Sequence, residues 1–146
     1  MKTLRVGVFE TNSSSQHEIC YPCASAYANL HVEPCTIKVE GSGNYDWGYE
    51  VLETPAELLD YWLVAVSMDG GLSDCYETEK VKVIEYFASK QVTLVLPEKS
   101  KDISGYIDHQ SVYRATMLGA FIRDPEALFN FVFCPESKII IDNDNR

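Results

Sequence analysis

The densest group of polar side chains is the run Thr11-Asn12-Ser13-Ser14-Ser15-Gln16-His17. Hydroxyl groups and backbone amides in a tight turn can form concave anion sites. The candidate phosphate-binding residues are therefore Thr11, Asn12, Ser13, Ser14 and Ser15. His17 can act as an acid, a base or a metal ligand. In an extended chain it shares a face with Ser15. The alternative is a hairpin turn whose Ser and Asn side chains bond to their own backbone.

A second candidate for acid–base chemistry is the pair Asp108 and His109, which Ser111 follows. Together with His17, these two residues are the candidate catalytic groups, because imidazole and carboxylate side chains transfer protons near neutral pH. Neighbours in a strand point to opposite faces, so Asp108 need not orient His109. Ser111 can instead be the N-cap of a following helix.

Two further motifs raise the possibility of metal or redox chemistry. Asp142 and Asp144 resemble the start of a calcium loop, but that loop needs Gly at its sixth position and Glu at its twelfth. The printed sequence ends at Arg146, so we expect no EF-hand, and a hard-cation site or a polar tail remains. Cys20 and Cys23 have redox-pair spacing, whereas a zinc site would need a second close pair. Buried structural thiols are the alternative.

The charge pattern points to a different kind of function. The net charge is −10, and the ten acidic residues between Lys38 and Lys80 are interrupted by no Lys, Arg or His. We therefore expect no direct nucleic-acid binding, because phosphate contacts need basic side chains. This stretch is either a solvated face or a docking face for a basic protein. The candidate partner-binding residues are Glu50, Glu53, Glu57 and Asp60.

Length and composition indicate one domain of ordinary globular type. The 146 residues are 46% hydrophobic and 23% charged, with no apolar run long enough for a membrane span. The N-terminus lacks the basic start and apolar run that are typical of a signal peptide. The number of cysteines, five, is odd. We therefore expect a cytoplasmic protein with reduced thiols and no membrane partner.

Hydrophobic periodicity and capping signals predict a single α+β domain over residues 1–146, with an antiparallel or mixed sheet and several packed helices. Trp47–Leu52 is the expected hairpin partner of Thr36–Glu40 across the turn at Gly41–Asn44. The predicted strands are Leu4–Phe9, His17–Tyr21, Thr36–Glu40, Trp47–Leu52, Gln91–Leu96 and Lys138–Ile141. The predicted helices are a first one from Pro55 to Asp69, then Thr78–Ser89, Ser111–Phe121 and Pro125–Phe133.

The N-terminal run from Val6 to His17 resembles the opening of a family of small uncharacterised proteins of bacteriophages and mobile elements. Its signature is F-E-T-N-S-S-S-x-H, and the segments 43–48, 106–111 and 142–145 also look similar. The resemblance implies a phage-type accessory protein in the cytoplasm of a bacterial host, and it implies no reaction or cofactor. It strengthens the functional interpretation of Thr11–His17, since a hairpin turn alone would not need so fixed a polar set.

Three functional hypotheses follow from these observations. The first is an acidic interaction protein that inhibits or modulates a nucleic-acid-handling host or defence protein, in the manner of an anti-CRISPR. The second is a small metal-, phosphate- or nucleotide-binding enzyme that uses the Thr11–His17 cluster, Asp108, His109 and the Asp142–Asn145 tail in one pocket. The third is an assembly component without a pocket, whose polar residues are internally hydrogen-bonded.

Overall fold

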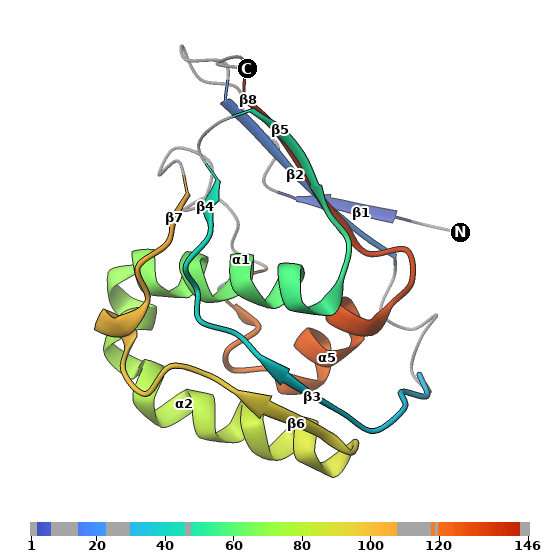
Figure 1. Cartoon of the computed structure of the whole chain (residues 1–146), viewed down its shortest axis with the longest axis vertical. Coiled ribbons are helices and arrows are strands. Elements are labelled where there is room, and N and C mark those ends of the chain that lie inside the picture. Colours follow the sequence, from blue (N-terminus) through green and yellow to red (C-terminus); the bar gives the residue numbers. More distant parts are fainter. Residues whose placement is uncertain are drawn as a thin grey trace.

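The computed structural model describes residues 3–6, 15–22, 30–45, 48–107, 118 and 120–143. They form a single α+β domain, as the sequence predicts, with one antiparallel sheet and two short parallel pairs (Figure 1). The strands are β1 (Thr3–Val6), β2 (Ser15–Pro22), β3 (Cys35–Lys38), β4 (Asn44–Tyr45), β5 (Tyr49–Leu52), β6 (Val92–Val95), β7 (Tyr106–Ile107) and β8 (Lys138–Asn143). The helices are α1 (Pro55–Met68), α2 (Gly70–Ser89), the short 3-10 helix η2 (Ser100–Asp102) and α5 (Pro125–Phe133).

The main sheet has the strand order β1-β2-β8-β5, and each neighbouring pair is antiparallel. β1 and β2, the two N-terminal strands, pair antiparallel, with Leu4 opposite Tyr21. Alternation along the strands places Ile19, Ile139 and Leu52 in one buried row across β2, β8 and β5. The helices lie on one side of the sheet (Figure 1), and the buried row belongs to the same hydrophobic core as their side chains.

The expected hairpin between residues 36–40 and 47–52 is wrong. β3 instead pairs in parallel with β6, and β5 pairs with β8. Hydrogen bonds from Gly105 N to Gly41 O and from Tyr106 N to Gly43 O carry the parallel ladder on to β4 and β7. Residues 96–104, which include η2, connect the two parts of this ribbon (Figure 1). A Cβ at position 105 would lie 2.5 Å from Gly43 O, so only glycine allows this approach.

Helix α1 is the centre of the protein. Its start is the one predicted: Thr54 is the N-cap, Pro55 is in the first turn, and Glu57 completes a capping box. Every residue from Leu58 to Val66 except Asp60 is buried, so the helix is enclosed on all sides rather than amphipathic. The sheet, the β3–β6 ribbon, α2 and α5 surround it (Figure 1).

Helix α2 begins eight residues earlier than the predicted start at Thr78. Asp69 ends α1 and also caps α2, because its Oδ1 accepts a hydrogen bond from Leu72 N at 3.1 Å. Gly70 and Gly71, a residue type common at helix ends, therefore lie in the first turn of α2. Val83 and Phe87 are buried on α2, whereas Val81 is 46% exposed.

Helix α5 confirms its prediction, with Asp124 as N-cap and Pro125 in the first turn. Its aromatic side chains join the other elements together. The Phe129 ring lies 5.2 Å from that of Phe87 on α2, and the Phe131 ring lies 5.3 Å from that of Tyr21 on β2. Such edge-to-face pairs stabilise the core beyond the area that they bury.

The capping box makes a stability prediction with a defined pH dependence. The backbone N–H groups of Thr54 and Glu53 donate to the Glu57 carboxylate and hold its pKa below the ordinary value. Because the folded pKa is lower than the unfolded one, this stabilisation is present above the unfolded pKa and lost as pH falls through the folded pKa. Glu57→Gln should lower the free energy of unfolding by about 0.3–1 kcal/mol at pH 7.

Chemical denaturation of wild type and Glu57→Gln between neutral and acid pH measures this effect. The difference between the two proteins should disappear in acid. Thr54→Ala is the contrast, since the acceptor that it removes from Glu57 N is uncharged, and most of its cost of about 1 kcal/mol should persist in acid. A Glu57→Gln effect that persists unchanged in acid would contradict the assignment.

Candidate functional site

His17 lies on β2 with its side chain in the core rather than in an open cleft. It is only 2% exposed, and its Nδ1 is 2.8 Å from the hydroxyl oxygen of Tyr61 on α1. One of these two groups donates the proton to the other, depending on the tautomer of the imidazole. The β2–β8 register sets Ile141 beside it on the same face of the sheet. His17 therefore joins the sheet to α1.

A second tyrosine continues this polar contact toward the surface. The Tyr45 ring lies 5.0 Å from the Tyr61 ring, and its hydroxyl donates to Asp60 Oδ2 at 2.6 Å. Burial raises the pKa of Tyr45 far above its ordinary value, and the hydrogen bond to Asp60 and the charges of Asp60 and Glu50 raise it further. The tyrosine therefore stays protonated and serves as a donor.

Asp60 organises the loop that precedes β4. Its Oδ1 accepts from Ser42 N at 3.1 Å, and its Oδ2 accepts from Gly43 N at 3.0 Å in addition to the Tyr45 hydroxyl. A Cβ at position 43 would lie 2.3 Å from the Tyr45 hydroxyl oxygen, so the backbone can approach this closely only as glycine. One carboxylate thus ties residues 42–45 to α1.

A hollow of about 400 Å³ lies beside this carboxylate, between the β3–β4 segment and the first turns of α1. We call it the acidic hollow, because three of its residues are acidic and one is basic. It is lined by Lys38, Val39, Glu40, Ser42, Gly43, Tyr45, Ala56, Glu57 and Asp60. Lys38 approaches Glu40 at 3.8 Å, and both side chains are 70% exposed, so this contact is a weak surface pair.

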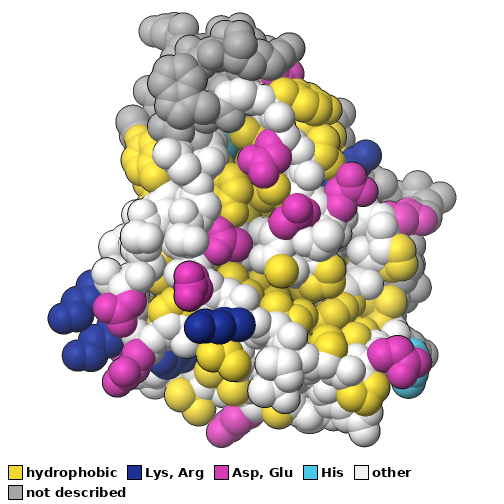
Figure 2. Space-filling model, in the orientation of Figure 1, with side chains coloured by type: hydrophobic (Ala, Val, Ile, Leu, Met, Phe, Trp, Pro, Cys, Tyr) yellow, Lys and Arg dark blue, Asp and Glu magenta, His cyan; other side chains and the backbone are white. Residues whose placement is uncertain are grey.

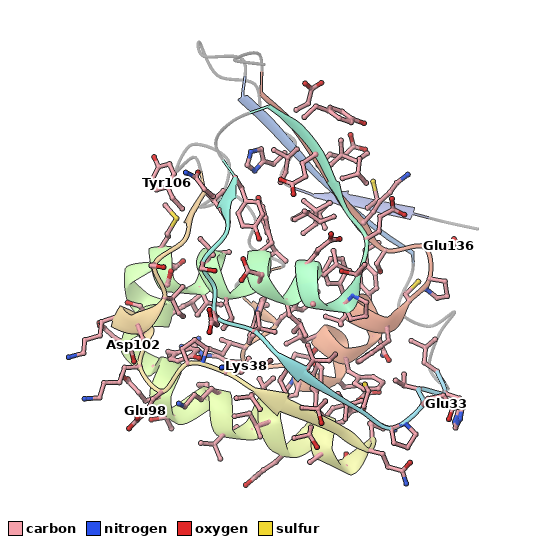
Figure 3. All side chains as sticks on the ribbon, in the orientation of Figure 1. Glu33, Lys38, Glu98, Asp102, Tyr106 and Glu136 are labelled. Carbon is pink, nitrogen blue, oxygen red and sulfur yellow. The ribbon has the colours of Figure 1, made fainter. Side chains whose placement is uncertain are left out.

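The carboxylates around the acidic hollow belong to one surface. Glu40, Glu50, Glu53 and Glu57 are exposed, and Asp60 is partly buried. Figure 2 shows acidic side chains spread over this face, whereas most Lys and Arg side chains of the view lie at its lower left. Figure 3 places Glu98 and Asp102 in that lower-left region and Lys38 nearer the middle. The face therefore has a clear excess of negative charge.

The acidic stretch does not form one continuous surface. Asp69 caps α2, whereas Asp74 and Glu77 are exposed on α2. Glu79 pairs with Lys82 at 3.2 Å on the same helix. Of the four candidate partner-binding residues, Glu57 and Asp60 are also engaged by backbone N–H groups. Substitutions of Glu50 and Glu53 are therefore better suited to test partner binding, because they do not remove these backbone contacts at the same time.

The second hypothesis places three polar segments in one pocket: Thr11–His17, Asp108–His109 and Asp142–Asn145. The structure brings the described parts of the first and the third together, because β2 pairs with β8. Ser15 lies opposite Asn143, Gln16 opposite Asp142, and His17 opposite Ile141. Asp142 is therefore part of β8 and not of a tail. The predicted site residues that lie outside the described residues are Thr11, Asn12, Ser13, Ser14, Asp108, His109 and Asp144. Their roles remain predictions.

The metal and redox hypotheses gain no support from the described part of the chain. Within it, no three His, Cys, Asp or Glu side chains gather where they could hold a metal ion. Cys20 and Cys134 are buried, Cys75 is partly buried, and Cys35 is exposed. Cys23 lies outside the described residues, so the pairing of Cys20 and Cys23 remains a prediction.

Tyr45 and Tyr61 are the two residues that the sequence analysis missed. Tyr61 lies inside the apolar run of α1, where a buried hydroxyl requires a hydrogen-bond partner. A tyrosine in this apolar run therefore indicates, from the sequence alone, a buried polar contact. Its partner, His17, depends on tertiary contacts. Tyr45 follows the predicted turn at Gly41–Asn44 and carries no comparable local signal.

Comparisons with known proteins find no matching family model, no matching curated protein and no matching solved structure. In the parts of the chain that the structure describes, no helix combines the length and the apolar character that crossing a membrane requires.

The Asp60 contacts predict a stability effect that is separate from charge. In Asp60→Asn an amide nitrogen replaces one acceptor oxygen, so at least one of the three donors loses its partner. We expect a loss of about 1–3 kcal/mol in the free energy of unfolding, measured by chemical denaturation. Asp74→Asn removes the same charge from exposed α2 and should leave stability within about 0.5 kcal/mol. Equal effects of the two substitutions would refute the anchoring role.

The His17–Tyr61 contact predicts coupling between the sheet and α1. Tyr61→Phe keeps the ring but removes the hydroxyl, which should cost about 1–3 kcal/mol because a buried imidazole loses this partner. A double-mutant cycle with His17→Phe should show a coupling energy of about 0.5–3 kcal/mol in the free energy of unfolding. Strict additivity of the two substitutions would show that the contact carries no energy.

Proposed function

We propose that this protein is an acidic interaction protein that binds a basic surface of a nucleic-acid-handling protein. The observation that carries the proposal is a group of exposed carboxylates. Glu40 and Glu57 line the acidic hollow, and Glu50 and Glu53 lie beside it, next to Tyr45 and Glu57. A surface of one sign steers an oppositely charged partner and raises the association rate by about 10–10³. Basic surfaces of this kind are those that hold nucleic-acid phosphates, so binding there competes with nucleic acid.

The phage-type origin and the role against a host or defence protein rest on the resemblance of residues 6–17. A small acidic protein of this kind acts by occupying the groove in which its target holds nucleic acid, as an anti-CRISPR-like inhibitor does. This mechanism requires no chemistry by the inhibitor itself. It also fits a chain of 146 residues whose net charge is −10.

The enzyme hypothesis has less support from the described residues. The candidate base, His17, is buried against Tyr61 and is 2% exposed. The acidic hollow contains no histidine, and its only described cation is Lys38. A phosphate ligand would be repelled by the acidic residues there. This enzyme function therefore remains the second candidate, and it rests on residues 11–14, 108, 109 and 144, which lie outside the described residues.

The test is affinity capture from a bacterial lysate, with the captured proteins identified by mass spectrometry. We expect a basic nucleic-acid-binding protein that is released by about 0.5 M salt or by added DNA. The informative variant is Glu50→Gln with Glu53→Gln, which neutralises two exposed carboxylates and leaves the backbone contacts of Glu57 and Asp60 in place. The matched control is Asp74→Asn with Glu77→Gln, which removes the same charge from α2.

The purified pair should then be measured by titration calorimetry. The Glu50/Glu53 variant should bind about tenfold more weakly, while the Asp74/Glu77 variant should bind as wild type does. Binding that ignores both salt and the Glu50/Glu53 substitutions would overturn the acidic-face mechanism.

A further inference from the structure

Strand β5 ends the strand order of the main sheet, and within the described residues only β8 pairs with it. We call the side of Glu50, Val51 and Leu52 that is turned away from β8 the β5 edge. Backbone N–H and C=O groups along such an edge can pair with a strand from another chain. These three residues of β5 (Tyr49–Leu52) span about 10 Å at the usual rise per strand residue.

The register of β5 determines which side chains flank this edge. Glu50 lies opposite Ile141, and Ile141 lies opposite His17, so Glu50 is on the face of the sheet that looks toward α1. The charge of Glu50 acts on Tyr45, which lines the acidic hollow. The face of β5 that carries Glu50 therefore looks toward the acidic hollow.

The loop after β5 extends the same negative surface. Glu53 is exposed immediately after the strand, and Glu57 and Asp60 follow on the first turns of α1. A strand added to the β5 edge would direct alternate side chains toward these carboxylates, because successive strand residues point to opposite faces. Its other side chains would lie beside Val51, which is partly buried.

We propose that the β5 edge accepts an extended, Lys- or Arg-rich segment of the partner protein as an added strand, with alternate basic side chains directed toward the acidic hollow. In this mode main-chain hydrogen bonds supply affinity, and the sites for alternate side chains supply specificity. The inference rests on the proposed function and specifies the form in which the partner's basic surface is recognised.

Charge also selects against a second copy of this chain as the occupant. Two β5 edges in antiparallel contact would bring the Glu50 and Glu53 carboxylates of both copies together, and like charges on paired strands are destabilising. A basic strand makes the opposite contact. Short length and charge also protect edge strands from any pairing, and this protective role is the competing outcome of the test.

The test uses the full-length, ¹⁵N-labelled protein and three synthetic peptides of about nine residues. The first alternates Lys and Val. The second has the same sequence and charge but is N-methylated at every second residue, so that one edge of it donates no backbone hydrogen bonds. The third alternates Glu and Val. Binding is followed by NMR titration at about 50 mM salt, together with amide hydrogen exchange at residues 50–52.

We expect the Lys/Val peptide to bind and to slow amide exchange in β5 about tenfold at saturation. The N-methylated peptide should bind about tenfold more weakly, and the Glu/Val peptide should not bind. Glu50→Gln with Glu53→Gln should weaken the Lys/Val peptide, whereas Asp74→Asn with Glu77→Gln should not.

Equal binding of the two basic peptides without slowed exchange in β5 would overturn strand addition, because charge alone would then account for binding. Failure of both basic peptides to bind would also overturn it and would favour edge protection. Neither result refutes the proposed function, which the capture experiment with the natural partner decides separately.

Discussion

The enclosure of α1 is the constraint on which the rest of the structure depends. From Leu58 to Val66 every side chain except that of Asp60 is buried, so the helix needs apolar surfaces around its whole circumference. Each large apolar side chain that is buried contributes about 1.5–3 kcal/mol relative to exposure. The main sheet, α2, α5 and the parallel ribbon supply those surfaces.

The polar groups of α1 are placed by the same enclosure. Tyr61 is inside the core, where its hydroxyl bonds to His17 of the sheet. Asp60 is at the boundary, where it binds the backbone N–H groups of residues 42 and 43. A buried polar group without a partner would cost about 1–3 kcal/mol, so each of these contacts also specifies how its element is oriented.

This arrangement separates two roles within the acidic face. Glu57 and Asp60 are charged residues with structural partners, and their loss would disturb the fold. Glu50 and Glu53 project from the edge strand and from the loop after it, where their charge is available to another molecule. The acidic hollow lies between the two groups. Glu57 and Asp60 therefore stabilise the shape of the surface that a partner would bind, and Glu50 and Glu53 add to its negative charge.

The sequence by itself determined the features that depend on contacts within a few residues. Thr54, Pro55 and Glu57 specify the start of α1 because a capping box closes within four positions, and Asp124 with Pro125 does the same for α5. The α+β class also followed from local alternation and turn residues. The start of α2 was missed because Gly70 and Gly71 favour helix ends locally, whereas Asp69 caps the next helix instead. Only the tertiary structure decided that β5 pairs with β8, that β3 pairs with β6, and that His17 meets Tyr61. These partners are separated by 44 or more positions in the sequence. They meet because they pack around α1, and no local sequence pattern encodes such long-range packing.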